Sequence, residues 1–358
     1  MGPNAKSDVL GAQVGLGIMP RLRTRLIAFG GLLAAAVCIS ACTAAATYPA
    51  PEVEKMDKHR GIAGAVQVSI GKARMVIVPA WAGRLSLLDF GWGNVLHNDP
   101  KVDGKVLKSD QAWGPWDGNA TDVVRGVVGK GSKNQFKGLW LHPWPKVSTP
   151  GGGSVEIASD VSRNAGLSAK RSYRLLCDGA CLQYDFTITN EGGQAAKWTI
   201  WERAMVKAGD YTIAPAAKEG AYPEGWKVRD QTRSIPADNA KTVGDFIVFK
   251  AGLKGAGMAA RLRDGWIATV YGRNVFLMTW KLDPRGSYPH YDGANAVFWI
   301  ARDFIEIEPL SPTVKLAKGK SLSFRQIWRG LELPDGLDPG DVRAVGKWLT
   351  KNAKPSAR

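Results

Sequence analysis

Residues 304–312 read Phe-Ile-Glu-Ile-Glu-Pro-Leu-Ser-Pro, and this stretch indicates the class of fold most directly. Apolar and acidic side chains alternate along it, which is the period-2 pattern of a β-strand. Proline cannot donate to the hydrogen-bond ladder of a sheet, so Pro309 is expected to end the strand. Glu306 and Glu308 are two residues apart and are therefore expected to point to the same face.

The same texture extends over most of the 358 residues. Short runs rich in β-branched and aromatic residues alternate with Gly, Pro and Asn turns, which predicts an all-β fold. Beside 304–309, the runs expected to form strands are 65–70, 75–78, 154–158, 170–176, 182–190, 197–206, 246–250, 266–271, 275–280, 296–301 and 321–328. One helix is expected near the end, with Asp338 as N-cap, Pro339 in its first turn and Lys351 at its close.

Cys177 and Cys181 enclose an Asp-Gly-Ala turn between two apolar runs. Asp-Gly is a strong tight-turn signal, so the segment is predicted to be a β-hairpin with a three-residue loop. The two cysteines are expected to face each other across the ladder and to form a disulfide in an oxidising compartment. So short a loop removes little chain entropy, so the bridge is expected to stabilise the fold modestly. No second Cys or His pair stands at ligand spacing, so the sequence indicates no metal site.

Three segments in chain order resemble the galactose-mutarotase-like superfamily, the β-supersandwich of the aldose 1-epimerases. They are 76–96, 182–214 and 304–328. In the first, a strand ends at Pro79 and a Gly-Arg turn follows, with Ala82 where the family has a glycine. The third holds a Glu-Pro pair, Glu308 and Pro309, like the family's terminal motif. The resemblance implies a supersandwich domain over 61–335, followed by a C-terminal helix and tail over 336–358.

The resemblance also implies candidate catalytic residues. Mutarotation needs a base for the anomeric hydroxyl and an acid for the ring oxygen. Glu308 falls on the family's catalytic glutamate, and Glu306 beside it would raise its pKa, since neighbouring carboxylates disfavour each other's ionisation. The family's histidine is missing here, because the corresponding strand reads Ile-Trp-Glu-Arg at 200–203. His142 and Glu202 are the remaining candidates for the acid, although an ion pair with Arg203 or Arg174 explains Glu202 equally well.

Several further residues are candidates for contact with a sugar. The chain has 14 tryptophans, and flat aromatic rings provide large contact area of defined geometry. Candidate ligand contacts are Trp113, Trp116, Trp140 and Trp144, which cluster around the long polar segment 101–138, with Arg84 in the first turn. A purely structural role for Arg84 explains it as well. Trp198, Trp280 and Trp299 lie in strand patterns and are expected in the core.

Residues 21–42 combine a basic head, a short apolar run and the sequence Ile-Ser-Ala-Cys. The apolar run is too short for a helix that spans a bilayer. This stretch resembles a bacterial lipoprotein signal peptide, which implies a leader over 1–41, lipidation of Cys42 and a tether over 42–60. It also implies a place in the cell envelope, and Thr43 after the cysteine favours the outer membrane, facing the periplasm.

The formal net charge of +16 is spread along the chain without a dense basic block. Together with export, this argues against a nucleic-acid partner. A basic surface near a lipid anchor is suited to anionic lipid or anionic glycan. The sequence shows no phosphate-binding loop, nucleophile elbow or zinc-protease motif, and no cofactor is expected.

The sequence therefore predicts a lipid-anchored envelope protein that recognises carbohydrate, with or without catalysis. Two alternatives stay open: an aldose 1-epimerase-like isomerase that interconverts sugar anomers, and a structural envelope protein without a ligand.

Overall fold

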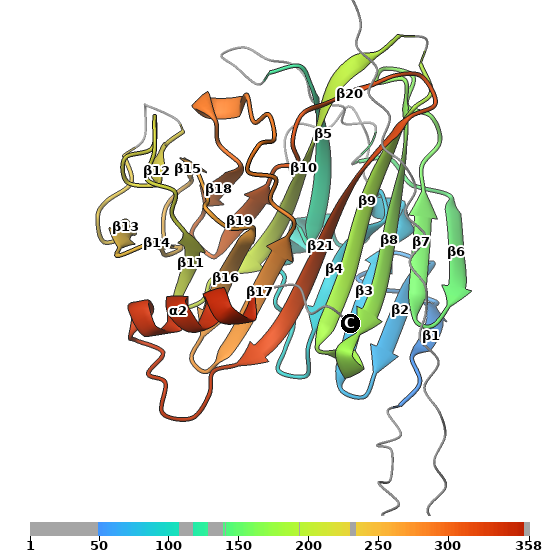
Figure 1. Ribbon diagram of the computed structural model, residues 1–358. Helices are drawn as coiled ribbons and strands as arrows, with labels where there is room; N and C mark the ends of the chain where they lie inside the picture. Colours follow the sequence, from blue (N-terminus) through green and yellow to red (C-terminus); the bar gives the residue numbers. More distant parts are fainter. Residues whose placement is uncertain are drawn as a thin grey trace, which may run out of the picture. The chain divides into compact units, whose positions relative to one another are not determined.

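The computed structural model describes residues 49–106, 117–127, 139, 141–192, 194–229 and 234–353. These residues form antiparallel sheets, and the predicted all-β class is confirmed (Figure 1). A four-stranded sheet runs in the order β1 (Glu52–Met56), β2 (Ala65–Ile70), β3 (Ala73–Val78) and β4 (Arg84–Asp89).

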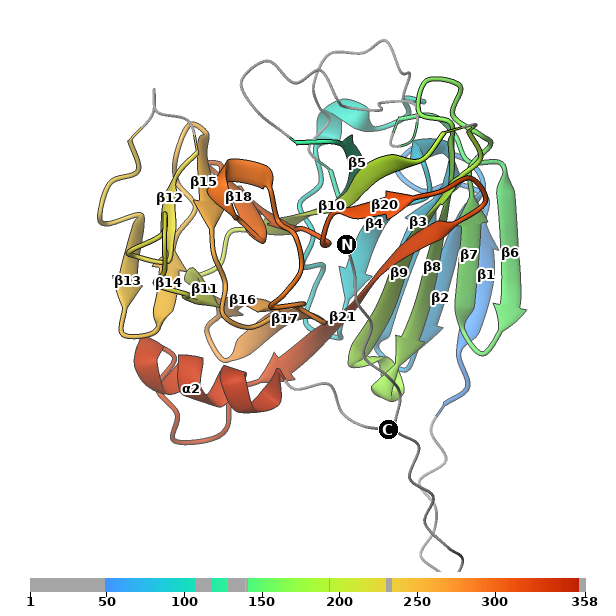
Figure 2. The same ribbon diagram turned by 45° about the horizontal axis from the view of Figure 1, so that its top comes forward.

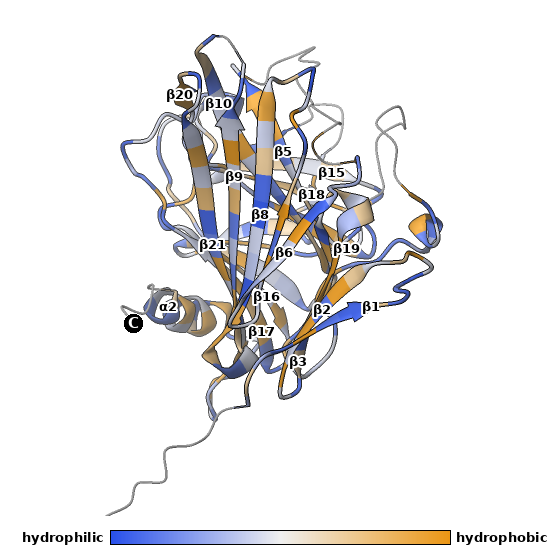
Figure 3. Ribbon diagram, turned by 90° about the vertical axis from the view of Figure 1, so that its right-hand side faces the viewer, coloured by the Kyte–Doolittle hydropathy of each residue, from blue (hydrophilic) through white to orange (hydrophobic). Residues whose placement is uncertain are grey.

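The largest sheet has ten strands, in the spatial order that follows. They are β13 (Ala240–Val243), β14 (Phe246–Phe249), β11 (Tyr211–Pro215), β16 (Trp266–Tyr271), β17 (Asn274–Trp280), β21 (Ser321–Glu332), β9 (Cys181–Asn190), β8 (Leu167–Leu176), β7 (Ser154–Ala158) and β6 (Lys146–Gly151). Side chains along β8 and β9 alternate between buried and partly exposed, so the sheet has one face on the core and one toward solvent (Figure 3).

A seven-stranded sheet carries the acidic strand singled out above. Its order is β12 (Trp226–Val228), β15 (Ala256–Ala260), β18 (Ala296–Ile300), β19 (Phe304–Pro309), β10 (Ala196–Lys207) and β20 (Val314–Leu316), with β5 (Asn119–Arg125) also paired to β10. Figure 2 shows β10 and β20 crossing in front of the strands of the other sheets.

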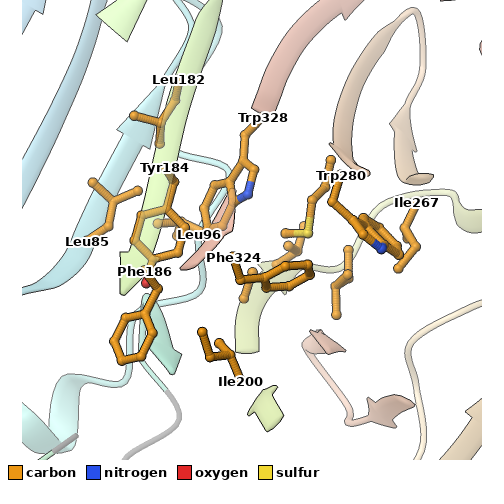
Figure 4. Close-up of a cluster of buried hydrophobic side chains, with 14 of the residues drawn as sticks. Leu85, Leu96, Leu182, Tyr184, Phe186, Ile200, Ile267, Trp280, Phe324 and Trp328 are labelled. Atoms are coloured by element: carbon orange, nitrogen blue, oxygen red, sulfur yellow. The ribbon is translucent and has the colours of Figure 1, made fainter. Parts of the chain in front are cut away.

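The main core lies between these sheets. Leu85 of β4, Ile200 of β10 and Trp328 of β21 all belong to one cluster of buried apolar residues. Within this cluster, the Tyr184 ring meets the edge of Trp328 at 5.8 Å between centroids (Figure 4). Because close packing of this kind tolerates little displacement, the core fixes where the strands of the seven-stranded sheet lie.

Part of the predicted tether, residues 42–60, forms a β-strand. β1 lies inside that range and pairs in antiparallel register with β2, from Glu52 opposite Ser69 to Met56 opposite Ala65. Its side chains are almost all exposed, so it lacks the alternation of apolar and polar residues by which a strand is recognised in sequence. Arg60, also in that range, pairs with the buried Asp117 at 2.7 Å.

The predicted C-terminal helix is α2 (Val342–Asn352), and its N-cap is Asp341 rather than Asp338. Asp341 Oδ1 accepts from the Ala344 amide at 3.0 Å. Asp338 instead stabilises the turn just before the helix, where its Oδ1 accepts from the Gly340 amide at 2.9 Å. Both aspartates precede the helix, and only the one whose following residues adopt helical dihedrals becomes the cap. No helix in the described ranges combines the length and apolarity needed to cross a bilayer.

The predicted hairpin and disulfide are present. β8 and β9 are joined by a short 3₁₀ turn, η3 (Cys177–Gly179), and Cys177 is bonded to Cys181. The two cysteines do not face each other across the ladder, because the residue opposite Cys181 is Leu176. Gly179 closes the turn with φ +90°, and an ideal Cβ there would lie 2.4 Å from Ala73 Cβ. The turn therefore packs directly onto the start of β3.

Gly179→Ala is expected to lower the free energy of unfolding by roughly 2–4 kcal/mol, because it adds a clash to the cost of a positive φ. Gly272→Ala is the matched control, since Gly272 also has a positive φ, +57°, but nothing lies within 4 Å of its Cβ position. Chemical denaturation of both variants measures the difference. Equal losses would mean that the contact with Ala73 contributes nothing.

Candidate functional site

The alternation of β19 separates its side chains into two sets. Ile305 and Ile307 belong to the main core, so Glu306 and Glu308 point to the opposite face of the sheet, together, as their spacing predicted. Ala204 of β10 lies opposite Ile307. In this register Arg203 stands beside Glu308, on the same outer face of the sheet.

Glu308 is surrounded by donors and positive charge. Trp201 Nε1 donates to its Oε2 at 2.6 Å. Arg203 Nε lies 3.9 Å from Oε2, and Arg229 Nη1 lies 3.9 Å from Oε1. The Glu308 side chain is 2% exposed, whereas those of Arg203 and Arg229 are 12% and 22% exposed. The carboxylate thus lies beneath two guanidinium groups that reach solvent.

Glu306 has a raised pKa. Burial, and then the negative charge of Glu308 with which it shares a hydrogen bond, raise the pKa of Glu306 to about 8, against the opposing pull of Arg203 and Arg229. At neutral pH Glu306 therefore keeps its proton beside Glu308. Neither Glu306 Oε1 nor Glu308 Oε1 has a hydrogen-bond partner among the described residues.

Aromatic rings hold the arginines in place. The Arg229 guanidinium lies over Trp299 at 5.4 Å and over Tyr291 at 5.9 Å from the ring centroids. Arg203 lies over Trp201 at 5.5 Å. An ideal Cβ on Gly257 would be 2.6 Å from Arg229 Nε, so the missing side chain at this position lets Arg229 lie flat against β15. We call Trp201, Arg203, Arg229, Trp299, Glu306 and Glu308 the outer-face cluster.

Glu202, a candidate for the acid, lies on the other face of β10. Its Oε2 accepts from Thr121 Oγ1 at 2.5 Å and its Oε1 from Asn119 Nδ2 at 3.1 Å. Thr121 also bonds Tyr184 and Arg171, at 2.7 and 3.0 Å. The network is buried inside the sandwich, so the structure separates Glu202 both from the outer-face cluster and from an ion pair with Arg203.

Arg84, the first residue of β4, lies in the interior of the protein. It is buried, and its Nη1 donates to the Asp117 carbonyl at 3.4 Å. Burial, together with the positive charges of Arg171 and Arg203, lowers its pKa to about 9 against the pull of Asp117. It therefore lies within electrostatic reach of the interior network and of the outer-face cluster.

The remaining predicted residues are placed as follows. His142 is exposed. Trp144 is buried in the main core, near Phe186 at 6.3 Å and beneath Arg171 at 5.1 Å, so it shares the interior with Glu202. Trp113, Trp116, Trp140 and Cys42 lie outside the described residues. Of the tryptophans predicted for the core, Trp198 and Trp280 are buried there, whereas Trp299 is half-buried beneath Arg229.

Sequence reasoning missed Arg229 and Tyr291, and assigned Trp201 and Arg203 no site role. A signal existed for two of them: Trp201 and Arg203 are two residues apart on a predicted strand, so they share one face. For Arg229 and Tyr291 no local pattern identifies the site. Pairing of β12 with β15 and of β18 with β19 brings them to Glu308.

The free energy of unfolding is expected to depend on pH through Glu202. Burial raises the pKa of Glu202 to about 7, against the charge of Arg171 and its hydrogen bonds. The folded state therefore holds this proton more tightly than the unfolded state, and its contribution is present at low pH and lost as pH rises through about 7. Glu202→Gln keeps the uncharged form at every pH. We expect this variant to lose less stability than the wild type between pH 5 and pH 8, by roughly 1–3 kcal/mol.

Denaturant titrations at pH 5 and pH 8 measure this difference. Glu332→Gln, at an exposed residue on β21, is the control and should follow the wild type at both pH values. A Glu202→Gln variant with the wild-type pH dependence would contradict the assignment of a buried, mainly protonated carboxyl.

Comparisons of sequence find no match, either to a protein-family model or to a curated protein. Solved structures do match. A candidate aldose 1-epimerase from Klebsiella pneumoniae has a TM-score of 0.57 at 12% identity, over 85% of this chain and 87% of that one. The Slr1438 protein from Synechocystis has a TM-score of 0.54 at 12% identity, over 73% and 92%.

A galactose mutarotase-like protein from Clostridium acetobutylicum has a TM-score of 0.51 at 10% identity, over 79% of this chain and 99% of that one. At identities this low the likeness is one of backbone arrangement. The chain has the galactose mutarotase-like β-sandwich fold that its three sequence segments predicted.

Proposed function

We propose that the outer-face cluster binds a sugar and interconverts the anomers of its hemiacetal. One observation carries the proposal: Glu306 and Glu308 lie side by side on one face beneath two arginines, and burial beside Glu308 raises the pKa of Glu306 to about 8. Two neighbouring carboxyl groups can supply an acid and a base at one site when one of them keeps its proton. This arrangement replaces the histidine that the family resemblance implies and the chain lacks.

The reaction balances on these two groups. Glu308 takes the proton of the anomeric hydroxyl, and Glu306 gives its proton to the ring oxygen as the bond from C1 to that oxygen breaks. The open-chain aldehyde then turns about the C1–C2 bond. On closure, the attacking hydroxyl returns its proton to Glu306, and Glu308 gives its proton to the carbonyl oxygen, so both groups regain their starting states.

The neighbouring side chains support this role. The two guanidinium groups above Glu308 offer donors to sugar hydroxyls and stabilise the negative charge as it moves between the carboxyls. Trp299 and Tyr291 are half-buried, so their rings provide apolar contact area at the edge of the site.

Binding without turnover is the second candidate, and the burial of the pair favours it. Glu306 and Glu308 are only 3% and 1% exposed, so a sugar held over Arg229 and Trp299 would not reach them without a rearrangement. Tryptophan fluorescence that responds to sugar without any change in the rate of mutarotation would support this candidate.

Glu308→Gln and Glu306→Gln are each expected to lower the rate of mutarotation by about 10²–10⁴-fold, because each removes one of two proton-transfer groups. Wild-type activity should also fall as pH rises through about 8, because the pKa of Glu306 lies there and the reaction needs its proton. Optical rotation of freshly dissolved aldoses measures the rate. Glu332→Gln, an exposed glutamate on another sheet, should match the wild type.

Full activity in Glu308→Gln would contradict the catalytic role of the pair. Undetectable activity in the wild type, with fluorescence that responds to sugar, would leave the binding role and remove the catalytic one.

We also propose that the chain is exported and lipid-anchored through Cys42 in the outer membrane. The proposal rests on the leader-like stretch 21–42. The bond between Cys177 and Cys181 supports it, because disulfides persist in oxidising compartments such as the periplasm.

Metabolic labelling with a palmitate analogue tests the anchor. The wild type and Cys38→Ser are expected to take up label and to partition with membranes, whereas Cys42→Ser should do neither. Label that persists in Cys42→Ser would contradict lipidation at this residue.

A further inference from the structure

A hollow of about 630 Å³ lies between α2 and the ten-stranded sheet. Its lining shares no residue with the outer-face cluster. Phe246 of β14 contributes an apolar wall, and the rim is basic. The lining residues are Gly244, Asp245, Phe246, Arg263, Arg343, Lys347, Thr350 and Lys351. Four cations against one carboxylate make this a strongly positive surface.

Three of the cations have no counterion within the described ranges. Arg343, Lys347 and Lys351 recur every four residues on α2, which places them on one side of the helix, and all three are exposed. By contrast, Arg263 lies 3.9 Å from Asp245 and 3.2 Å from Asp264. A row of unpaired cations on a helix binds anions presented as a row or a plane.

The helix holds this row rigidly. Val345 and Leu349 are fully buried in a core cluster of the ten-stranded sheet. An ideal Cβ on Gly346 would lie 2.5 Å from the Phe246 ring, so the missing side chain lets α2 sit directly against β14. The basic side therefore faces outward in a fixed orientation.

We propose that the α2 surface, defined as Arg343, Lys347 and Lys351 with Arg263, binds the phosphate head groups of an anionic lipid bilayer. The chain enters β1 toward the same end of the sheets at which α2 lies (Figures 1 and 2). This geometry rests on the proposed anchor at Cys42, because a lipid on that residue would bring this end of the fold to the membrane. Basic residues near such a surface add to the attraction of an acyl chain.

Vesicle binding by the full chain carrying Cys42→Ser tests the surface without any acyl chain. The vesicles are phosphatidylcholine alone, or phosphatidylcholine with about 30% of the anionic lipid phosphatidylglycerol. We expect binding to the anionic vesicles that exceeds binding to the neutral ones and falls as salt rises. Adding Arg343→Gln, Lys347→Gln and Lys351→Gln together should weaken the anionic component about ten- to a hundredfold.

A second triple variant, Lys315→Gln, Lys318→Gln and Lys320→Gln, is the matched control. It removes the same charge around β20, at the end of the fold opposite α2 in Figure 1, and should leave most of the binding intact. Equal losses in both triple variants would overturn the proposal, since net charge alone would then explain the attraction.

Two further arms identify the ligand. Millimolar inorganic phosphate that displaces the protein from vesicles at constant ionic strength would overturn the membrane assignment in favour of a free anion. Tighter binding to polygalacturonate than to vesicles, lost in the α2 variant, would overturn it in favour of an acidic glycan. A failed anchor would show in the labelling experiment and leave these vesicle results unchanged.

Discussion

The outer-face cluster depends on one constraint, the register in which β10 pairs with β19. Ala204 lies opposite Ile307, so Arg203 stands beside Glu308 and both point away from the core. A slip of one residue would turn Ile305 and Ile307 outward and carry the carboxyl groups into the apolar interior. Packing of the two isoleucines in the core thus fixes the position of Glu306 and Glu308. It does so although desolvation of the two carboxyl groups is unfavourable.

The two faces of the seven-stranded sheet carry carboxyl groups that differ in their hydrogen bonding. Both oxygens of Glu202 accept from protein donors inside the sandwich. On the outer face, one oxygen of Glu306 and one of Glu308 accept no hydrogen bond from the described residues. All three side chains are buried, so burial does not separate a structural carboxyl from a functional one. Unused hydrogen-bonding capacity separates them, because a native fold seldom leaves such groups unpaired without a reason.

Local patterns predicted the parts of the structure that depend on neighbours in sequence. Strand alternation placed Glu306 and Glu308 on one face, and the Asp-Gly turn predicted the hairpin between β8 and β9. The same rule separates Glu202 and Arg203, which are neighbours on β10, onto opposite faces of the sheet. β1 could not be predicted, because a strand whose side chains are almost all exposed shows no alternation of apolar and polar residues.

Sequence could not supply the parts that depend on long-range pairing. Arg229, which directly follows β12, contacts Glu308 across about 80 residues of chain. A contact between residues so far apart in sequence leaves no local sequence pattern. Gly257 permits that contact by lacking a side chain, and an isolated glycine in a strand has several explanations. Ala82 adopts φ +56°, the left-handed conformation that glycine favours, at the position where the family resemblance expects a glycine.

The most direct test of the account is a carbon-13 NMR titration of the glutamate carboxyl groups, with Glu306 assigned by its loss in Glu306→Gln. The account predicts a Glu306 midpoint raised to about 8. It predicts that the midpoint falls when Glu308→Gln removes the neighbouring charge, and that an added aldose perturbs the signal. A Glu306 midpoint in the ordinary range of glutamate, unchanged in Glu308→Gln and unaffected by sugar, would contradict it.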